Sequence, residues 1–304
     1  MSVKATALPP PAAGLTLGVL CGLGAALLWA AQVPISAIAV RGNLPAADLV
    51  ALRFIVAGVL LAPVLWHGRG HGPVAGIGWR RGIILSLTGG PAFLMGLLAG
   101  LAYAPASHSA AIVNGLTPVF AVLLGISLLS LRPGGRELAG IAIVIAGVLT
   151  LGWQSLMTDI AMQDAWFGDL LFLAAAILWG SYTVLCRRWD IHPLRGAAVL
   201  NVLGAAYLPF WLLFYDSHIP AAPWDEIVWQ GFYQGIATGI VAIVVYSRAI
   251  ALLGSSLASL FSAFIPALVI LMAIPLLGEM PAPLEWAGIT LATCGMILAL
   301  SRRR

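Results

Sequence analysis

The chain has 304 residues, of which 61% are hydrophobic and 9% are charged, and its formal net charge is +4. Soluble domains carry about 25% charged residues, so this composition excludes an ordinary water-soluble protein. Runs of about 20 apolar residues, the length that crosses the hydrocarbon core of a bilayer, recur along the whole sequence. We therefore expect an all-α polytopic membrane protein whose first partner is the lipid bilayer.

The residues needed for several kinds of chemistry are missing or badly spaced. Lys4 is the only lysine, which excludes a phosphate-binding loop of the G-x-x-x-x-G-K-[ST] type. The five histidines lack the spacing of metal ligands. The three cysteines lie in apolar runs, so they do not indicate a disulfide framework. We expect no metal, no cofactor and no nucleic-acid partner.

Apolar runs between breaks of charge, proline and glycine predict ten transmembrane helices. They lie near residues 15–39, 46–66, 81–103, 107–130, 136–153, 166–187, 194–215, 227–250, 255–278 and 284–301. The first run is too long for the apolar region of a cleavable signal peptide, so we expect it to remain as a helix. The loops are short, which leaves no room for a soluble domain.

The basic residues predict how the chain is oriented. All but two of the 15 lysines and arginines fall on one side, and the exceptions are Arg41 and Arg53. Because cytoplasmic loops are enriched in lysine and arginine, the N-terminal tail (1–14) and the C-terminus (302–304) are both expected in the cytoplasm. The opposite loops are acidic. We expect a multi-pass protein of the cytoplasmic (inner) membrane of a bacterium.

The two halves of the chain resemble each other at an offset of 148 residues. The matching pairs are Pro45 and Pro193, Pro118 and Pro266, Pro133 and Pro281, Glu137 and Glu285, Gly140 and Gly288, and Gly147 and Gly295. The repeats 15–153 and 166–301, joined by an external loop at 154–165, hold five helices each. Because five is odd, the second repeat must enter the membrane upside down. Inverted repeats around a central cavity, with substrate near the midplane, are typical of secondary transporters.

Polar residues inside apolar runs are costly unless they face the interior of the helix bundle or a wet cavity. Gln32 follows Trp29 by three residues, and Tyr182 follows Trp179 in the same way, so each pair shares one helical face. We expect the two pairs to form two walls of one substrate cavity. Simple packing and interhelical hydrogen bonding are the alternative.

Two segments are expected to interrupt or bend their helices. Pro34 removes a backbone hydrogen bond from the first helix, and the run Gly89, Gly90, Pro91 weakens or kinks the third. Broken helices expose N–H and C=O groups that can bind the carboxylate and ammonium of an amino acid. A kink that serves packing or a rocking motion explains the same residues equally well.

The remaining candidates lie in the second to fourth helices. Phe93 is expected to offer an apolar face, and the deeper Asn114 an amide for the substrate or another helix. His108, near a helix end, is expected at the membrane interface, where its imidazole can act as a pH-sensitive group. Arg53 is expected to contact backbone carbonyls or a lipid headgroup. All carboxylates lie near helix ends or in loops, which disfavours obligate proton antiport through a buried acid and favours a facilitator.

Several sequence elements resemble one known family. They are the LLW and ILW runs of the first and sixth helices, ALRF at 51–54, YAPASHSAAIVNGLTP at 103–118, and LLGE at 276–279 followed by WAGITLATCGMILAL. Together they resemble the drug/metabolite transporter superfamily, in its ten-helix, EamA-like branch, and are most similar to YddG-type amino-acid exporters. One departure is Leu131, which stands at the position equivalent to Glu279.

The resemblance implies a secondary transporter that exports neutral, aromatic or otherwise apolar, amino acids and related metabolites by alternating access. A drug or other metabolite exporter of the same fold, with proton coupling, is the alternative. A nucleotide-sugar carrier would want basic residues inside the cavity, and none is evident in the sequence. A channel would need a charged ring or a carbonyl filter, and neither motif is present. A membrane enzyme is disfavoured, because His108 with Ser107 or Ser109 lacks a third catalytic group. We expect a monomer, since the GxxxG stripes most simply pack helices of one chain.

Overall fold

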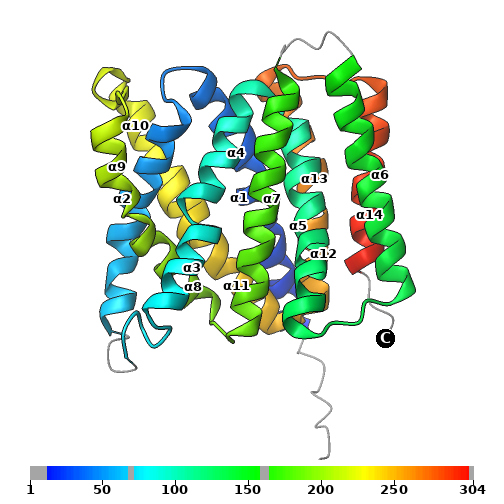
Figure 1. The fold of residues 1–304 in the computed structure, drawn as a ribbon, viewed down its shortest axis with the longest axis horizontal. Helices are drawn as coiled ribbons and strands as arrows, with labels where there is room; N and C mark the ends of the chain where they lie inside the picture. Colours follow the sequence, from blue (N-terminus) through cyan, green and yellow to red (C-terminus); the bar gives the residue numbers. More distant parts are fainter. Residues whose placement is uncertain (1–11, 68–71, 158–163, 301–304) are drawn as a thin grey trace, which may run out of the picture.

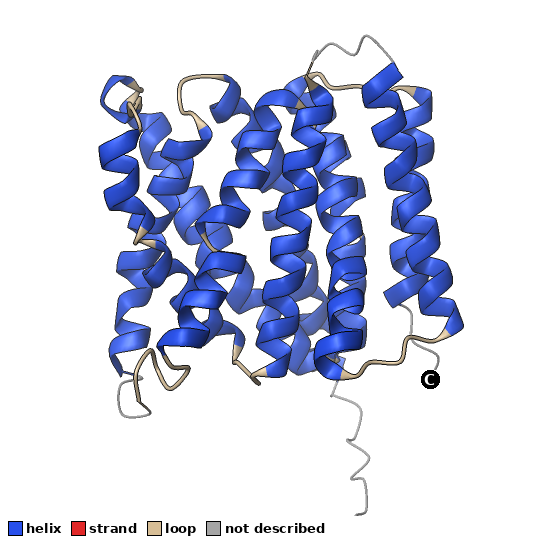
Figure 2. Ribbon diagram, in the orientation of Figure 1, coloured by secondary structure: helices blue, strands red, loops and turns tan. Residues whose placement is uncertain are grey.

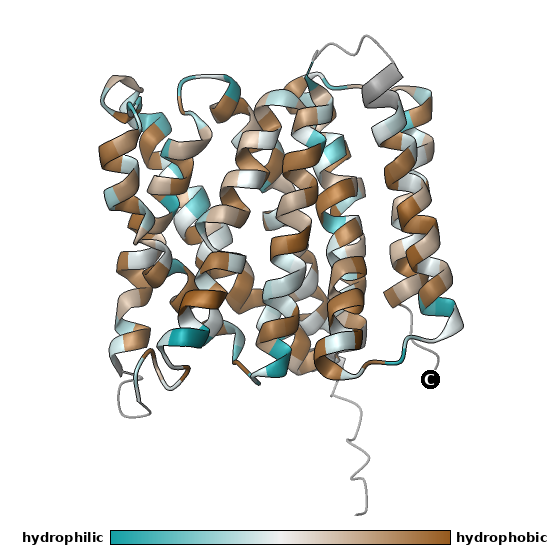
Figure 3. Cartoon of the chain, viewed as in Figure 1, coloured by the Kyte–Doolittle hydropathy of each residue, from teal (hydrophilic) through white to brown (hydrophobic). Residues whose placement is uncertain are grey.

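The computed structural model describes residues 12–67, 72–157 and 164–300, and the regular secondary structure of these residues is entirely helical (Figure 2). Ten helical segments among them are long and apolar enough to cross a membrane, and they run side by side in one block (Figure 1). Apolar residues dominate along the helices, and many of the polar residues gather near their ends (Figure 3). The expected ten-helix, all-α architecture is therefore confirmed, with each span within three residues of its predicted position.

The helices, in chain order, have the following bounds: α1 (Ala12–Arg41), α2 (Ala46–His67), α3 (Trp79–Gly89), α4 (Pro91–Tyr103), α5 (Ala106–Leu129), α6 (Gly135–Met157), α7 (Ala165–Arg188), α8 (Pro193–Gly204), α9 (Tyr207–Phe214), η2 (Ile219–Ala221), α10 (Trp224–Gln230), η3 (Gly231–Val241), α11 (Ala242–Leu253), α12 (Ser255–Ala263), α13 (Ile265–Leu277) and α14 (Pro283–Leu300). The short 3-10 helix η2 lies outside the membrane spans. The segment η3 is a π-helix.

The third span of each half departs from a regular α-helix. In the first half the span is interrupted at Gly90, between α3 and α4. In the second half the equivalent span, Trp224–Leu253, contains the π-helix η3 in its middle. π-helical turns are uncommon and are often found at functional sites. The irregular backbone therefore recurs in the same span of both repeats.

The packing of α6 against α14, at one edge of the block in Figure 1, shows how the halves are related. A Cβ atom added to Gly140 would lie 2.7 Å from the Gly295 carbonyl oxygen, and one added to Gly147 would lie 2.5 Å from that of Gly288. Gly140 corresponds to Gly288 at the 148-residue offset, and Gly147 corresponds to Gly295, so the repeat relates one contact to the other. The same exchange relates the packing of α1 on α11 and α13 to that of α7 on α4 and α5. The halves are inverted copies, and each packs its first helix into the other half.

The two ends of the bundle differ in charge. The face at which α1 begins and α14 ends, the lower one in Figure 1, carries arginines close to helix ends and is called the basic face here: Arg80, Arg81, Arg132, Arg136, Arg187, Arg188 and Arg195. The opposite face, called the acidic face, carries the acidic side chains near the other helix ends: Asp164, Asp216, Asp225, Glu226 and Glu279. Exposed tryptophans lie near both faces, as at membrane–water interfaces: Trp66, Trp79, Trp153, Trp166, Trp224 and Trp229.

Candidate functional site

Three of the predicted site residues form one aromatic stack beside the break between α3 and α4. Trp179 stacks on Phe93, with ring centroids 4.7 Å apart, and on Tyr182, with centroids 4.9 Å apart. Phe93 belongs to the first turn of α4, and Gly89 at the end of α3 lies against the Tyr182 ring. A Cβ atom on Gly89 would come within 2.6 Å of that ring. The break therefore positions the aromatic stack, which is defined as Phe93, Trp179 and Tyr182.

A second group of polar side chains joins α1 and α2 to the eighth span. On α10 and η3 every fourth residue is polar: Glu226, Gln230, Gln234 and Thr238. Gln234 lies at the centre, because its Oε1 accepts a 3.0 Å hydrogen bond from Gln32 and its Nε2 donates a 2.7 Å bond to the Ser36 hydroxyl. Gln230 donates to the Ile35 carbonyl at 3.2 Å. We call the group the polar ladder, with these members: Gln32, Ser36, Arg53, Gln230, Gln234 and Thr238.

Arg53 is part of the polar ladder, and the expectation that it contacts a headgroup or backbone carbonyls was wrong. It follows Ala46 by seven residues, which places it about 10 Å along α2, and the residue is only 8% exposed. Its NH1 donates to the Thr238 hydroxyl at 3.3 Å. The hydroxyl itself lies 3.2 Å from the Tyr233 carbonyl oxygen and 3.1 Å from that of Gln234. The π-helix thus presents Thr238 to a buried guanidinium.

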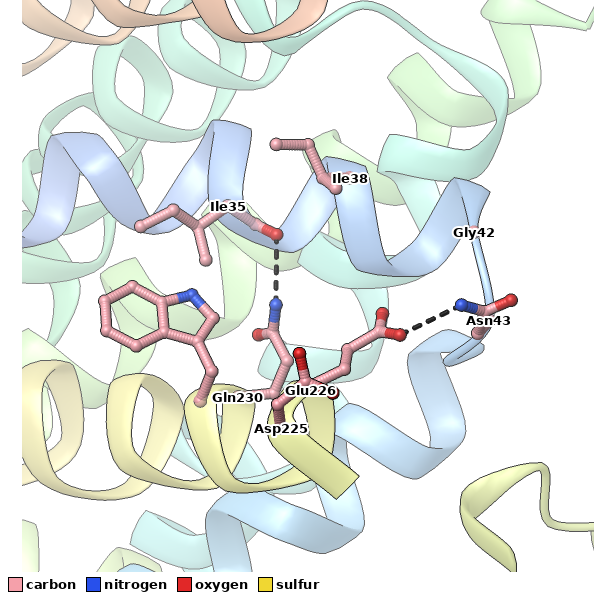
Figure 4. Close-up of a pocket in the computed structure, with 8 residues that line it drawn as sticks. Ile35, Ile38, Gly42, Asn43, Asp225, Glu226 and Gln230 are labelled. Atoms are coloured by element: carbon pink, nitrogen blue, oxygen red, sulfur yellow. Dashed lines mark hydrogen bonds between the residues drawn. The ribbon is translucent and has the colours of Figure 1, made fainter. Parts of the chain in front are cut away.

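A pocket of about 420 Å³ opens at the acidic end of the polar ladder, between α1 and α10 (Figure 4). Its lining residues are Ile35, Ile38, Gly42, Asn43, Asp225, Glu226, Trp229 and Gln230. The Asn43 amide donates to Glu226 at 3.0 Å across the mouth, and Gln230 reaches the Ile35 carbonyl at the base (Figure 4). The polar ladder therefore runs from an acidic surface pocket toward Arg53 inside the bundle.

His108 lies in a third cluster, close to the start of α5 as expected but buried inside the bundle. It is 0% exposed, because α5, α7 and α14 converge around it. Its Nδ1 lies 2.8 Å from Asp169 Oδ1 and its Nε2 lies 3.2 Å from Glu285 Oε1. The carboxylates are near helix starts, as predicted, but they are turned inward onto one imidazole. An imidazolium that donates from both ring nitrogens satisfies both carboxylates.

Arg41 and Glu279 form an ion pair at the acidic face, which we call the latch. Arg41 also donates to the carbonyl oxygens of Leu101 and Ala104 at the end of α4, at 2.8 and 3.1 Å. The second oxygen of Glu279 accepts a 2.8 Å bond from the Ala106 backbone at the start of α5. The latch therefore ties α1 and the segment after α13 to two helix ends of the first repeat.

The other half has no equivalent of the latch, for a simple reason. Leu131 occupies the position that matches Glu279, and it packs onto Gly125 at the basic face. An apolar side chain cannot hold an arginine. The ion pair of the latch is thus particular to the acidic face, although the backbones are related by the inverted repeat.

The other predicted site residues are placed as follows. The Asn114 amide donates to the Ala110 carbonyl of its own helix at 3.1 Å. Helix α1 continues through Pro34 without a break, because one missing hydrogen bond is tolerated when neighbouring helices support the turn. Trp29 packs edge-on against Tyr246, with centroids 5.2 Å apart. Among the described residues, no hydrogen bond or ring contact joins the Trp29 and Gln32 pair to the aromatic stack.

Sequence reasoning missed the partners that the eighth span supplies. Gln230, Gln234 and Thr238 recur at intervals of four residues inside an apolar run, which is the spacing of one helical face. That pattern was available in the sequence. The π-helix that carries it has no comparable signature, apart from the glycines that pack against α2.

Comparisons with known proteins agree with this architecture. A sequence model of the EamA-like transporter family matches residues 16–153 and again residues 166–301. Among curated relatives, the uncharacterized transporter YyaM of Bacillus subtilis (strain 168) is 27% identical over 191 residues, which cover 60% of this chain and 61% of that protein. The uncharacterized transporter YoaV of the same organism is 24% identical over 260 residues, which cover 83% of this chain and 87% of that protein.

A probable amino-acid metabolite efflux pump of Escherichia coli (strain K12) is 34% identical over 100 residues, which cover 33% of this chain and 32% of that protein. A solved crystal structure superimposes with a TM-score of 0.59 and 23% identity over 93% of this chain and 96% of that one, which shows a shared fold. Since the family match takes in both repeats and nearly the whole chain, the protein belongs to the EamA-like transporter family.

Proposed function

We propose that this transporter exports neutral amino acids with aromatic or other apolar side chains, and related small metabolites, by alternating access. The observation that carries the proposal is the pairing of an aromatic stack with a polar ladder inside the membrane spans. Aromatic rings suit an apolar side chain. Amide and hydroxyl groups suit the polar end of a zwitterion, and their burial in an apolar bundle is costly without such a use.

The chemistry of the described interior favours this substrate class over others. The polar ladder offers five neutral side chains and one arginine, so it suits one carboxylate better than several phosphates. The relative described as an amino-acid metabolite efflux pump supports the same class, although it aligns with only 33% of this chain. Export, rather than uptake, is proposed on the strength of that relative and of the family resemblance.

Alternating access is supported by the irregular backbone of two equivalent spans. The break at Gly90 and the π-helix η3 lie in equivalent spans of the inverted repeats. Rocking of one repeat against the other, around a site near the midplane, is the motion such repeats permit. The latch joins helix ends at the acidic face, and its rupture would be part of a movement that opens that face.

Proton-coupled export of a drug or other metabolite is a second candidate, favoured by the His108 cluster. An imidazole between two carboxylates can gain and lose a proton as the surrounding helices move. The imidazole belongs to α5 in the first repeat and the carboxylates belong to α7 and α14 in the second, so both repeats contribute to the cluster.

The test is flux into sealed proteoliposomes that contain the purified protein. Labelled phenylalanine, leucine, lysine and glutamate are compared, first without an ion gradient and then with a pH gradient. We expect saturable, gradient-free flux of phenylalanine and leucine that falls in Trp179→Ala and Gln32→Ala. The control is Trp153→Ala, which removes an exposed tryptophan far from the aromatic stack. Flux only under a pH gradient would favour the proton-coupled candidate, and no amino-acid flux in either condition would reject the proposal.

A further inference from the structure

Arg53 is a cation inside the bundle that has no acidic partner among the described residues. The ion pairs of those residues join Arg41 to Glu279 and His108 to its two carboxylates, and none involves Arg53. A charged side chain in a membrane interior is costly and usually faces a water-filled path or an opposite charge. A single neutral hydroxyl at 3.3 Å does not compensate a guanidinium. An anion beside the guanidinium would compensate this charge.

The guanidinium also has donors to spare. It carries five N–H groups in a planar fork, and the described structure shows one bond, from NH1 to Thr238. Among the described residues, the fully buried side-chain nitrogen and oxygen atoms that make no hydrogen bond are Thr117 Oγ1 and Asn201 Oδ1. No atom of Arg53 belongs to this group. The spare N–H groups therefore keep some accessible surface, although the residue is only 8% exposed.

The surroundings hold Arg53 in place. The glycines of η3 bring that helix close to α2, because a Cβ atom on Gly235 would lie 2.5 Å from the Val56 Cβ. At Gly239 an added Cβ would lie 3.9 Å from Arg53 Cζ, in ordinary contact. The guanidinium is thus fixed between two closely packed helices, as a recognition site requires.

The opposite repeat provides a natural comparison. Asn201 of α8 is the residue that the 148-residue offset pairs with Arg53, and α2 packs against α8. Its Nδ2 donates to the Ala197 carbonyl at 2.8 Å, and its side chain is fully buried. The repeat has kept a polar side chain at this position in both halves, but a charge in only one. The buried cation is therefore present in only one of the two repeats.

We propose that Arg53 binds the carboxylate of the transported substrate and so restricts transport to compounds that carry one. The inference rests on the proposed function, since it names the chemical group of the substrate that the transporter recognises. Arginine matches a carboxylate with two parallel N–H···O bonds, and the polar ladder leads from the acidic pocket to this point. Amines and amides of the same shape lack the group that Arg53 needs.

The experiment is competition against labelled phenylalanine flux in proteoliposomes. The unlabelled competitors are phenylalanine, 3-phenylpropionate, phenylalaninamide and 2-phenylethylamine. In the wild type we expect the two carboxylates to compete at least about tenfold better than the amide and the amine, which is what one charge-assisted bond provides. Arg53→Met should abolish this preference, and Arg53→Lys should keep part of it, because lysine retains the charge but not the fork.

Asn201→Ala is the matched control, since it changes the equivalent buried position in the other repeat and should leave the preference for carboxylates intact. Size-exclusion profiles show which variants fold, and Arg53→Lys carries the test if Arg53→Met does not. An unchanged preference in both Arg53 variants, or a wild type that accepts the amide as well as the acid, would overturn the inference. A structural role for Arg53 would lower stability without altering the ratio between competitors.

A second readout separates this inference from the proposed function. The melting temperature of the purified protein is measured with 3-phenylpropionate and with 2-phenylethylamine. Stabilisation by the carboxylate alone, lost in the Arg53 variants, supports the anion site even if no amino acid is transported. If the wild type transports phenylalanine but no carboxylate stabilises it and the competitors do not differ, the function stands and the anion site is rejected.

Discussion

Gly89→Ala tests how tightly the break between α3 and α4 is packed onto the aromatic stack. The new methyl group would lie 2.6 Å from Tyr182 Cδ2, inside the van der Waals distance. The ring cannot move away freely, because Trp179 stacks on it and a Cβ atom on Gly196 would lie only 2.7 Å from its hydroxyl oxygen. Overpacking of this kind costs about 1–3 kcal/mol, and the gain in helix propensity from glycine to alanine returns about 0.5–1 kcal/mol.

The net loss is therefore about 0.5–2 kcal/mol, seen as a fall of a few degrees in melting temperature and as reduced flux. The assay is thermal unfolding of the purified variant in detergent, beside phenylalanine flux. Gly152→Ala is the control, since an added Cβ there meets no atom within 4 Å. Adding Tyr182→Ala to Gly89→Ala should relieve the clash, so the double variant should lose less than the sum of the two single losses. A Gly89→Ala protein as stable and as active as the wild type would refute this packing.

Two further predictions concern the charged groups near the acidic face. Glu279→Gln should weaken the latch by about 0.5–1 kcal/mol, as expected for a partly exposed ion pair. The labelling rate of a cysteine placed at Ser36 should therefore rise about two- to fivefold. Equal labelling with and without the Glu279→Gln change would argue against a gate at this face. His108→Gln removes the imidazole that lies between Asp169 and Glu285, so the melting temperature of the variant should fall clearly below that of the wild type; an unchanged melting temperature would contradict this account.

The ten spans and their order could be predicted because length and composition decide whether a segment enters a membrane. The relation between the halves followed from six paired residues, and the contacts of Gly140 with Gly295 and of Gly147 with Gly288 show its physical basis. The break at Gly90 could also be anticipated, since glycine and proline weaken a helix wherever they occur together. These features can be read from composition and sequence pattern, without knowledge of which side chains meet in the fold.

The placement of charged residues could not be predicted in the same way. His108 and Arg53 were judged by their distance from helix ends, which says nothing of what neighbouring helices bring. His108 is buried because Glu285, 177 residues away, reaches it from the last helix. Gln32 finds its partner 202 residues away, in a π-helix with no clear sequence signature. Such partners are fixed by tertiary packing, so only the structure reveals them.

The most direct measurement of the central claim is phenylalanine efflux from bacterial cells that produce this transporter. The cells are loaded with a phenylalanine-containing dipeptide, which cytoplasmic peptidases split, and phenylalanine is then followed in the medium. Cells with the wild-type protein should release it faster than cells with Trp179→Ala or cells without the protein, at equal protein levels in the membrane. Equal release from all three would contradict the proposal that this transporter exports neutral aromatic amino acids.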